Sequence, residues 1–184
     1  SQSFRDQSIG ELLTLRAFGY YDLTVQFGDV PYFRTLLSSD DLSTLPRTPM
    51  VTIRTDMKED LEKAFTLLPS SYPSSDLGRM TKWAAMALKS KYHLMDKEWA
   101  DCLAACKNII DNSPHKLMEK FEDVYGYSST TPSTQVKPEH IMWVDYSGAS
   151  GLNQGTMQAN NGMTNEFNPR PVSYTHLTLP TIRL

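Results

Sequence analysis

The chain has 184 residues, of which 40% are hydrophobic and 21% charged, and its formal net charge is -3. This length and apolar content are enough for one domain with a buried core. The acidic balance, without a run of Lys or Arg, argues against nucleic acid as a partner, because phosphate binding needs a basic field. No stretch reaches the roughly 20 continuous apolar residues that cross a bilayer, and the polar start SQSFRDQS does not have the pattern of a signal peptide.

A long helix is predicted over residues 9–27. Apolar residues and one arginine recur there at spacings of three and four, which places them on one stripe: Ile9, Leu13, Arg16, Tyr20, Leu23 and Phe27. The other faces are nearly as apolar, so we expect this helix to be packed on most of its sides. Gly28 supplies the positive φ that closes a helix, and Pro31 prevents the helix from resuming.

Arg16 lies inside this apolar stripe. An arginine in such a position most often lays its stem on the core and binds a carboxylate or the carbonyls of a helix end. We therefore expect a structural role for Arg16 rather than a ligand contact, with Asp22 or Asp29 as its partner. Asp29 follows the helix stop directly, and the alternative for it is to organise its own turn by accepting backbone hydrogen bonds.

Three more helices are predicted in the middle of the chain. Residues 32–49, rich in Ser, Asp and Pro, form a long surface connection, and the second helix starts near Ile53. Residues 78–112 then form two helices around a tight turn, with Trp83 and Trp99 on faces that belong in the core. The alanines where these helices would cross (Ala84, Ala87, Ala104, Ala105) resemble those of a tetratricopeptide-like hairpin, which needs stacked neighbours to bury both of its faces.

The C-terminal third is predicted to hold little regular structure. Residues 115–126 indicate a short amphipathic helix, and EHIMWVDYS, residues 139–147, a short strand. From Val172 the sequence VSYTHLTLPTIRL has neither helical nor strand periodicity and resembles a translated sequencing adapter. We therefore expect residues 171–184 not to belong to the native protein, the alternative being a genuine extended C-terminal peptide.

The sequence gives little support for catalysis or for metal binding. It contains no Gly-x-Ser-x-Gly, no glycine-rich phosphate loop and no His-Glu-x-x-His, and no pair of its acids is singled out as a glycosidase pair. Cys102 and Cys106, together with His93, lack the second ligand pair of a zinc site. The cysteines are better explained as small buried residues. We expect no enzyme, no metal and no cofactor.

Several motifs stand in a fixed order along residues 3–147. They are LRAFxYYxL, FGDVP, a helix that closes in LLP, GRMTKWAAMALKSKYHL, a Trp-Ala helix that ends in IID, and PEHIMWVDYS. Together they resemble the SusD/RagB family, the glycan-binding lipoproteins of Bacteroidetes outer membranes. The resemblance implies a mainly α fold, with a helical scaffold of tetratricopeptide-like hairpins, irregular loops and a short strand. It also implies noncatalytic binding of an oligosaccharide, or in some members a peptide, for uptake through a SusC-like TonB-dependent transporter.

Members of that family are several hundred residues long. Residues 1–170 are therefore expected to be a partial SusD-like domain without its signal, its lipidated cysteine and its C-terminal part. The resemblance places the full-length protein on the cell surface, held to the outer membrane by a lipid anchor. The alternative is a soluble tetratricopeptide-like repeat module that binds a peptide or a protein in a groove.

Aromatic residues that reach solvent are the candidate glycan contacts. A sugar site needs a ring face on which the sugar stacks and polar side chains for its hydroxyls. Tyr32 and Phe33 follow the helix stop directly and are our candidates, with plain packing as the alternative. Trp83, Trp99 and Trp143 are assigned to packing, and the amides of residues 153–161 to a solvated loop.

Overall fold

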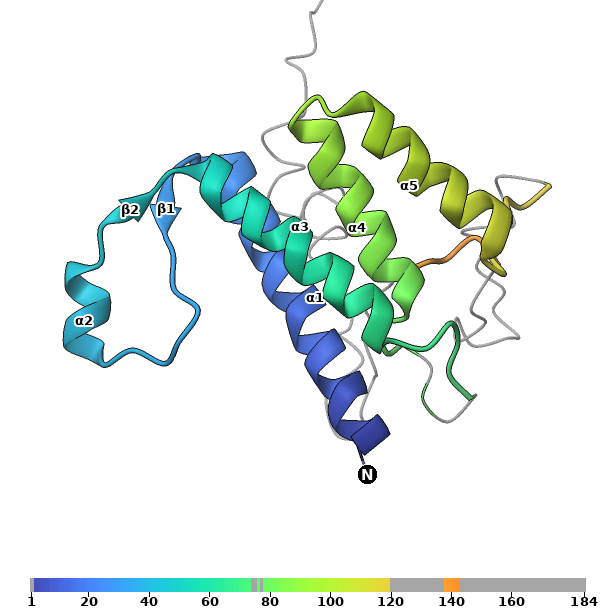
Figure 1. The fold of residues 1–184 in the computed structure, drawn as a ribbon, viewed down its shortest axis with the longest axis horizontal. Coiled ribbons are helices and arrows are strands. Elements are labelled where there is room, and N and C mark those ends of the chain that lie inside the picture. The colour runs from blue at the N-terminus through green and yellow to red at the C-terminus, as the bar shows by residue number, and fades with distance from the viewer. Residues whose placement is uncertain (1, 74–75, 77, 120–137, 143–184) are drawn as a thin grey trace, which may run out of the picture. The chain divides into compact units, whose positions relative to one another are not determined.

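A computed structural model describes residues 2–73, 76, 78–119 and 138–142, with the elements in the order α1, β1, α2, β2, α3, α4 and α5 (Figure 1). Within these residues the fold is mainly helical, as the sequence predicts. No helix of the described part is long and apolar enough to cross a membrane. The predictions for Trp143, for residues 153–161 and for the C-terminal tail lie outside the described residues.

Helix α1 (Gln2–Phe27) ends where the sequence predicts. Gly28 has a φ of 69°, and its N–H donates to the Thr24 carbonyl at 3.2 Å. Asp29 does not organise its own turn but accepts the N–H of Met50 at 2.8 Å. Because Met50 is the first residue of α3 (Met50–Leu67), this bond ties the end of α1 to the start of α3.

The buried face of α1 differs from the predicted stripe. Its buried residues are mostly small or hydroxylated, namely Gly10, Thr14, Ala17, Tyr20 and Thr24. Small side chains allow a neighbouring chain to approach closely, and a Cβ on Gly10 would lie 2.7 Å from Cγ of Leu68. Large apolar residues of α1 are exposed instead: Leu12, Leu15, Val25 and Phe27. The expectation that α1 is packed on most sides is therefore wrong within the described residues.

Helix α3 lies between α1 and α4 (Lys82–Met95) and carries much of the core. Its apolar face is buried: Ile53, Met57, Leu61, Ala64 and, just past the helix end, Leu68. Burial of each larger side chain contributes about 1.5–3 kcal/mol. Tyr92 of α4 completes this core, with no exposed surface and with its hydroxyl donating to the Ala17 carbonyl at 2.7 Å.

Helices α4 and α5 (Trp99–Asn112) form the predicted hairpin (Figure 1). Lys97, with a φ of 61°, makes the turn between them. Trp83 is 2% exposed, as expected, and stands edge-on to Phe65. Trp99 is 63% exposed, so its predicted core position is wrong. The reason is that α5 packs mainly on α4, which leaves the outer side of α5 uncovered by the described residues.

The connection between α1 and α3 is more ordered than the sequence predicts. Strand β1 (Val30–Pro31) pairs antiparallel with β2 (Arg47–Thr48), and Pro31 lies opposite Arg47. Between the strands, α2 (Ser39–Thr44) begins with a capping box, in which the Ser38 hydroxyl accepts the Asp41 N–H at 3.2 Å. A Ser followed three residues later by an acid is a sequence signal for a helix start, so α2 was detectable.

Two further predicted elements are irregular where the structure describes them. Residues 115–119 are not helical, and residues 139–142 are not a strand. The two segments contact each other instead. Lys116 N–H donates to the Pro138 carbonyl at 3.2 Å, and Met118 N–H donates to the Glu139 carboxylate at 2.9 Å.

Candidate functional site

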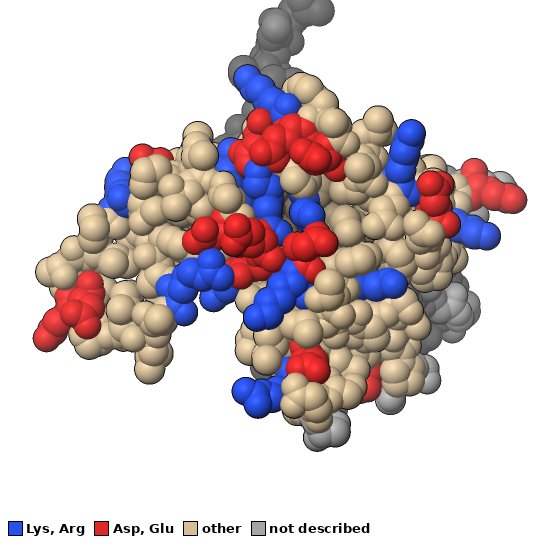
Figure 2. Space-filling model, viewed as in Figure 1, with Lys and Arg blue, Asp and Glu red and all other residues tan. Residues whose placement is uncertain are grey.

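A compact group of aromatic and charged residues lies where the connection after α1 passes along α3. We call it the loop-base cluster, and it consists of Arg16, Tyr32, Phe33, Arg34, Asp56 and Asp60. Asp56 and Asp60 are four residues apart on α3, so they lie one helical turn apart on the same flank. Charged side chains of both signs meet over α3 on the face that Figure 2 shows.

Asp60 is the buried centre of this cluster, with 4% of its side chain exposed. Arg16 donates to Oδ2 of Asp60 from Nε at 3.0 Å and from Nη2 at 2.5 Å. Arg34 donates to Oδ1 at 2.6 Å. Both arginines make charge-assisted bonds, the stronger class of hydrogen bond. The partner of Arg16 is therefore Asp60, and the expectation of Asp22 or Asp29 is corrected.

Tyr32 is fixed in place by its ring and its hydroxyl. The hydroxyl donates to Asp56 at 2.8 Å, and the ring stands edge-on to Tyr20, with 5.0 Å between the ring centroids. Burial and the hydrogen bond to Asp56 raise the pKa of Tyr32 to about 12, so the phenol keeps its proton at neutral pH. Tyr32 thus anchors the segment to the core, which favours packing as its main contribution.

Phe33 and Arg34 reach the surface beside this anchor. Phe33 is 43% exposed, while its backbone N–H donates to the Tyr20 hydroxyl at 3.3 Å. Arg34 has 42% of its side chain exposed and also pairs with Asp56 at 3.2 Å. Burial alone would lower the pKa of Arg34, but the neighbouring acidic groups outweigh that effect and leave it raised. The cluster therefore carries a partly exposed ring at Phe33, which is held through its backbone, together with a fixed cation at Arg34 and a carboxylate at Asp56.

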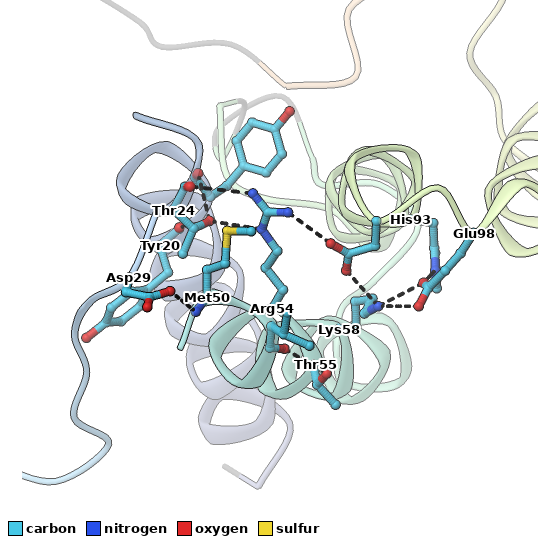
Figure 3. A network of polar contacts seen from close by, with 12 residues as sticks. Tyr20, Thr24, Asp29, Met50, Arg54, Thr55, Lys58, His93 and Glu98 are labelled. Atoms are coloured by element: carbon cyan, nitrogen blue, oxygen red, sulfur yellow. Dashed lines mark hydrogen bonds and ion pairs between the residues drawn. The ribbon is translucent and has the colours of Figure 1, made fainter. Parts of the chain in front are cut away.

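The opposite flank of α3 carries a second set of ion pairs, which Figure 3 shows from close by. We call it the turn network, and it consists of Arg54, Lys58, His93, Asp96 and Glu98. Arg54, whose side chain is 8% exposed, bonds to Asp96 at 3.0 Å and to the Thr24 carbonyl at 3.4 Å. This network joins α1, α3 and the turn between α4 and α5, so its evident role is to hold the helices together.

A second surface combines aromatic and polar groups. A groove of about 420 Å³ lies between α1, α4 and residues 139–142, with Phe18, Tyr21 and Leu88 among its apolar walls and Asp22 and Lys91 among its charged ones. The structure thus places Asp22 in this groove rather than next to Arg16. The groove and the loop-base cluster use different faces of α1.

Most of the polar residues in these sites were missed from the sequence. The available signal was a pair of acids at Asp56 and Asp60 and a pair of bases at Arg54 and Lys58, each at a spacing of four beside an apolar face. Such spacing places two charges on one flank of a helix. It does not reveal which distant residue they meet.

The chain has clear relatives in sequence. Residues 1–94 match the SusD-like family described as "Starch-binding associating with outer membrane". A SusD-like protein of Formosa agariphila is 30% identical over 161 residues, which are 86% of this chain and 30% of that protein. The chain therefore spans less than a third of this curated relative.

Solved structures agree with this relationship. A SusD-like protein from Bacteroides fragilis NCTC 9343 matches with a TM-score of 0.59 and 33% identity, over 64% of this chain and 23% of that one. A laminarin-binding SusD-like protein matches with a TM-score of 0.65 and 21% identity, over 68% of this chain and 28% of that one. At 21% identity the second match shows a shared fold alone.

Proposed function

Because this chain belongs to the SusD-like family, we propose that it takes part in noncatalytic capture of a glycan at the bacterial cell surface. The observation that carries the proposal is the match of residues 1–94 to a family described as starch-binding and associated with the outer membrane. The captured oligosaccharide would pass to a SusC-like TonB-dependent transporter. As the chain spans 30% of its Formosa relative, the activity of the whole protein is part of this proposal.

The loop-base cluster is the glycan contact that we propose on this chain. Sugars bind proteins through an aromatic ring stacked on their apolar face and through polar side chains bonded to their hydroxyls. Phe33 supplies an exposed ring, and Tyr32 fixes the backbone that carries it. Arg34 and Asp56 supply a donor and an acceptor within the same cluster.

The arrangement suits binding better than hydrolysis. Glycosidases place two carboxyl groups on either side of the scissile bond, one as acid and one as base or nucleophile. Asp60 is 4% exposed, and its two oxygens accept bonds from Arg16 and Arg34. Both oxygens of this carboxylate are therefore already bonded and cannot approach a glycosidic bond. This supports a noncatalytic role for the cluster.

The outer-membrane location and the transporter are the finer parts of the proposal. We infer that the whole protein is held on the cell surface by a lipid anchor, as the family description associates its members with the outer membrane. A pull-down from Bacteroidetes outer membranes tests the partner. A TonB-dependent transporter in the captured material supports the proposal, and its absence with the full-length protein as bait contradicts it.

Glycan binding is tested by native electrophoresis through gels that contain starch, laminarin or no polysaccharide. We expect at least one polysaccharide to retard the chain, with no release of reducing sugar on prolonged incubation. Equal mobility in all gels contradicts glycan binding. Binding to an immobilised peptide library instead would favour the helical-repeat alternative, and turnover of the polysaccharide would favour a hydrolase.

A further inference from the structure

The turn between α4 and α5 gathers three side chains whose chemistry suits a metal ion. His93 lies in the last turn of α4, Glu98 precedes the first residue of α5, and Asp101 lies in the first turn of α5. One ligand atom from each of the three lies within 4.8 Å of the others. The backbone fixes this grouping, because Lys97 is left-handed and the Glu98 N–H donates to the His93 carbonyl at 2.9 Å.

We propose that His93, Glu98 and Asp101 form a binding site for a divalent metal ion of the zinc type. One imidazole nitrogen and two carboxylate oxygens are ligands that zinc accepts, and three protein ligands leave a position for water. A calcium ion is a poorer fit, since it takes six to eight oxygen ligands. The proposal departs from the sequence-based expectation of no metal. Its ligands are also not the cysteines that the sequence analysis rejected, because Cys102 and Cys106 are not members of the set.

The surroundings of the three ligands support the site. His93 is 9% exposed, and Asp101 has no hydrogen-bond or ion-pair partner among the residues that the structure describes. Both side chains line one hollow of about 250 Å³ between α4 and α5. An imidazole and a carboxylate that pairs with no other described residue thus face the same space, which has room for an ion and its waters.

Lys58 is the competitor of the metal at this site. Its ammonium lies 2.8 Å from both oxygens of Glu98 and 2.9 Å from Asp96 (Figure 3). When Glu98 binds a metal ion in place of Lys58, the Lys58 ammonium still pairs with the Asp96 carboxylate. The contact of 2.5 Å between His93 Nδ1 and Glu98 Oε2 must then widen to about 3 Å, since zinc holds each ligand at about 2 Å.

The test is a calorimetric titration of zinc chloride into the 184-residue chain with Cys102 and Cys106 both replaced by serine. These replacements remove thiol ligands from the measurement. We expect one zinc ion per chain, and Asp101→Asn should weaken binding by about tenfold or more, the range seen when even an outer partner of a ligand is lost. Asp111→Asn is the matched control, an exposed aspartate of the same helix, and should leave the affinity unchanged.

Three results would overturn the site. The first is a zinc titration of the serine-replaced chain that gives no saturable heat. The second is a zinc affinity of Asp101→Asn equal to that of the parent, and the third is a loss of zinc affinity in Asp111→Asn as large as in Asp101→Asn. Circular dichroism of each variant checks the fold, and Asp101 is exposed, so its replacement should leave the helices intact. Zinc binding that requires the cysteines assigns the metal to the thiols and likewise contradicts the proposal.

Discussion

Arg16 on α1 and Asp60 on α3 form an ion pair across the interface of the two helices, with Nη2 and Oδ2 2.5 Å apart. The same carboxylate also accepts a bond from Arg34 in the connection between the helices. One buried group therefore links the helical scaffold to the segment that carries Phe33. The stability of the scaffold and the geometry of the candidate glycan contact depend on the same residue.

Asp60→Asn should lower the free energy of unfolding by about 1.5–3 kcal/mol, because the partly exposed Arg16 and Arg34 lose their charge-assisted bonds to one buried carboxylate. The substitution keeps the shape of the side chain and removes its charge from two arginines. Urea denaturation measures the change. Asp22→Asn, an exposed acid on α1, should stay within about 0.5 kcal/mol of the parent chain. Equal effects of the two substitutions would contradict the buried pair.

Replacing either of two glycines of α1 by alanine should change the free energy of unfolding, in opposite directions at the two positions. At Gly10 a Cβ would lie 2.7 Å and 2.9 Å from atoms of buried Leu68, so Gly10→Ala should destabilise the chain by about 1–3 kcal/mol. At Gly19 an added Cβ would meet no atom of the other described elements within 4 Å, so Gly19→Ala should stabilise the chain by about 0.5–1 kcal/mol through helix propensity. Thermal unfolding of both variants measures this. A stabilising Gly10→Ala would show that α1 and α3 are not in close contact.

Two adjacent isoleucines of α5 test which side of that helix is packed. Ile109 is 9% exposed and Ile110 is 74% exposed. Ile109→Ala should therefore cost about 2–4 kcal/mol, whereas Ile110→Ala should cost less than about 0.5 kcal/mol. Urea denaturation of the pair gives the comparison. A large cost at Ile110 would mean that the outer face of α5 is covered in solution.

Alkaline pH should destabilise the chain through one buried phenol, Tyr92, and two half-buried ones, Tyr32 and Tyr72. Burial and nearby carboxylates raise the pKa values of Tyr32 and Tyr72 to about 12, and burial raises that of Tyr92 as well. In an unfolded chain a tyrosine loses its proton near pH 10. Above that pH the unfolded state binds fewer protons than the folded state, so stability falls as the pH rises from about 10 to about 12.

The measurement is the free energy of unfolding across that range, with phenolate absorbance followed in parallel. Tyr32→Phe should show a shallower fall than the parent chain, because it has one shifted phenol fewer. An identical slope for the variant would contradict the raised pKa of Tyr32, which burial and the hydrogen bond to Asp56 cause.

The C-terminal end of α1 and the hairpin could be predicted because local residues determine them. The start of α1 could not, since the apolar pattern begins at residue 9 while the helix begins at Gln2. Gly28 takes the positive φ that ends α1, and the pattern of residues 78–112 contains both helices of the hairpin. The buried face of α1 could not be predicted from periodicity, since the helix is apolar on nearly every side. The face with Gly10 and Ala17 is the buried one because its small side chains let α1 approach α3 closely. Periodicity carries no information on the distance between two helices.

The candidate sites depend on pairings that the sequence leaves open. Asp60 lies 44 residues from Arg16 and 26 from Arg34, and only the crossing of α1 and α3 brings the three together. Trp99 was misplaced for a related reason. Its helix packs mainly on α4, and an apolar pattern does not tell whether a second neighbour covers the other side.

Glycan binding at Phe33 is tested by isothermal titration of a laminarin or starch oligosaccharide into the parent chain, Phe33→Ala and Leu36→Ala. Leu36 is a fully exposed apolar residue of the same connection and serves as the control. We expect saturable binding that Phe33→Ala weakens by roughly twofold to twelvefold, as loss of one aromatic contact of about 0.5–1.5 kcal/mol requires, while Leu36→Ala leaves it unchanged. Absence of binding to every glycan, or equal affinities for Phe33→Ala and the parent chain, would contradict glycan binding at Phe33.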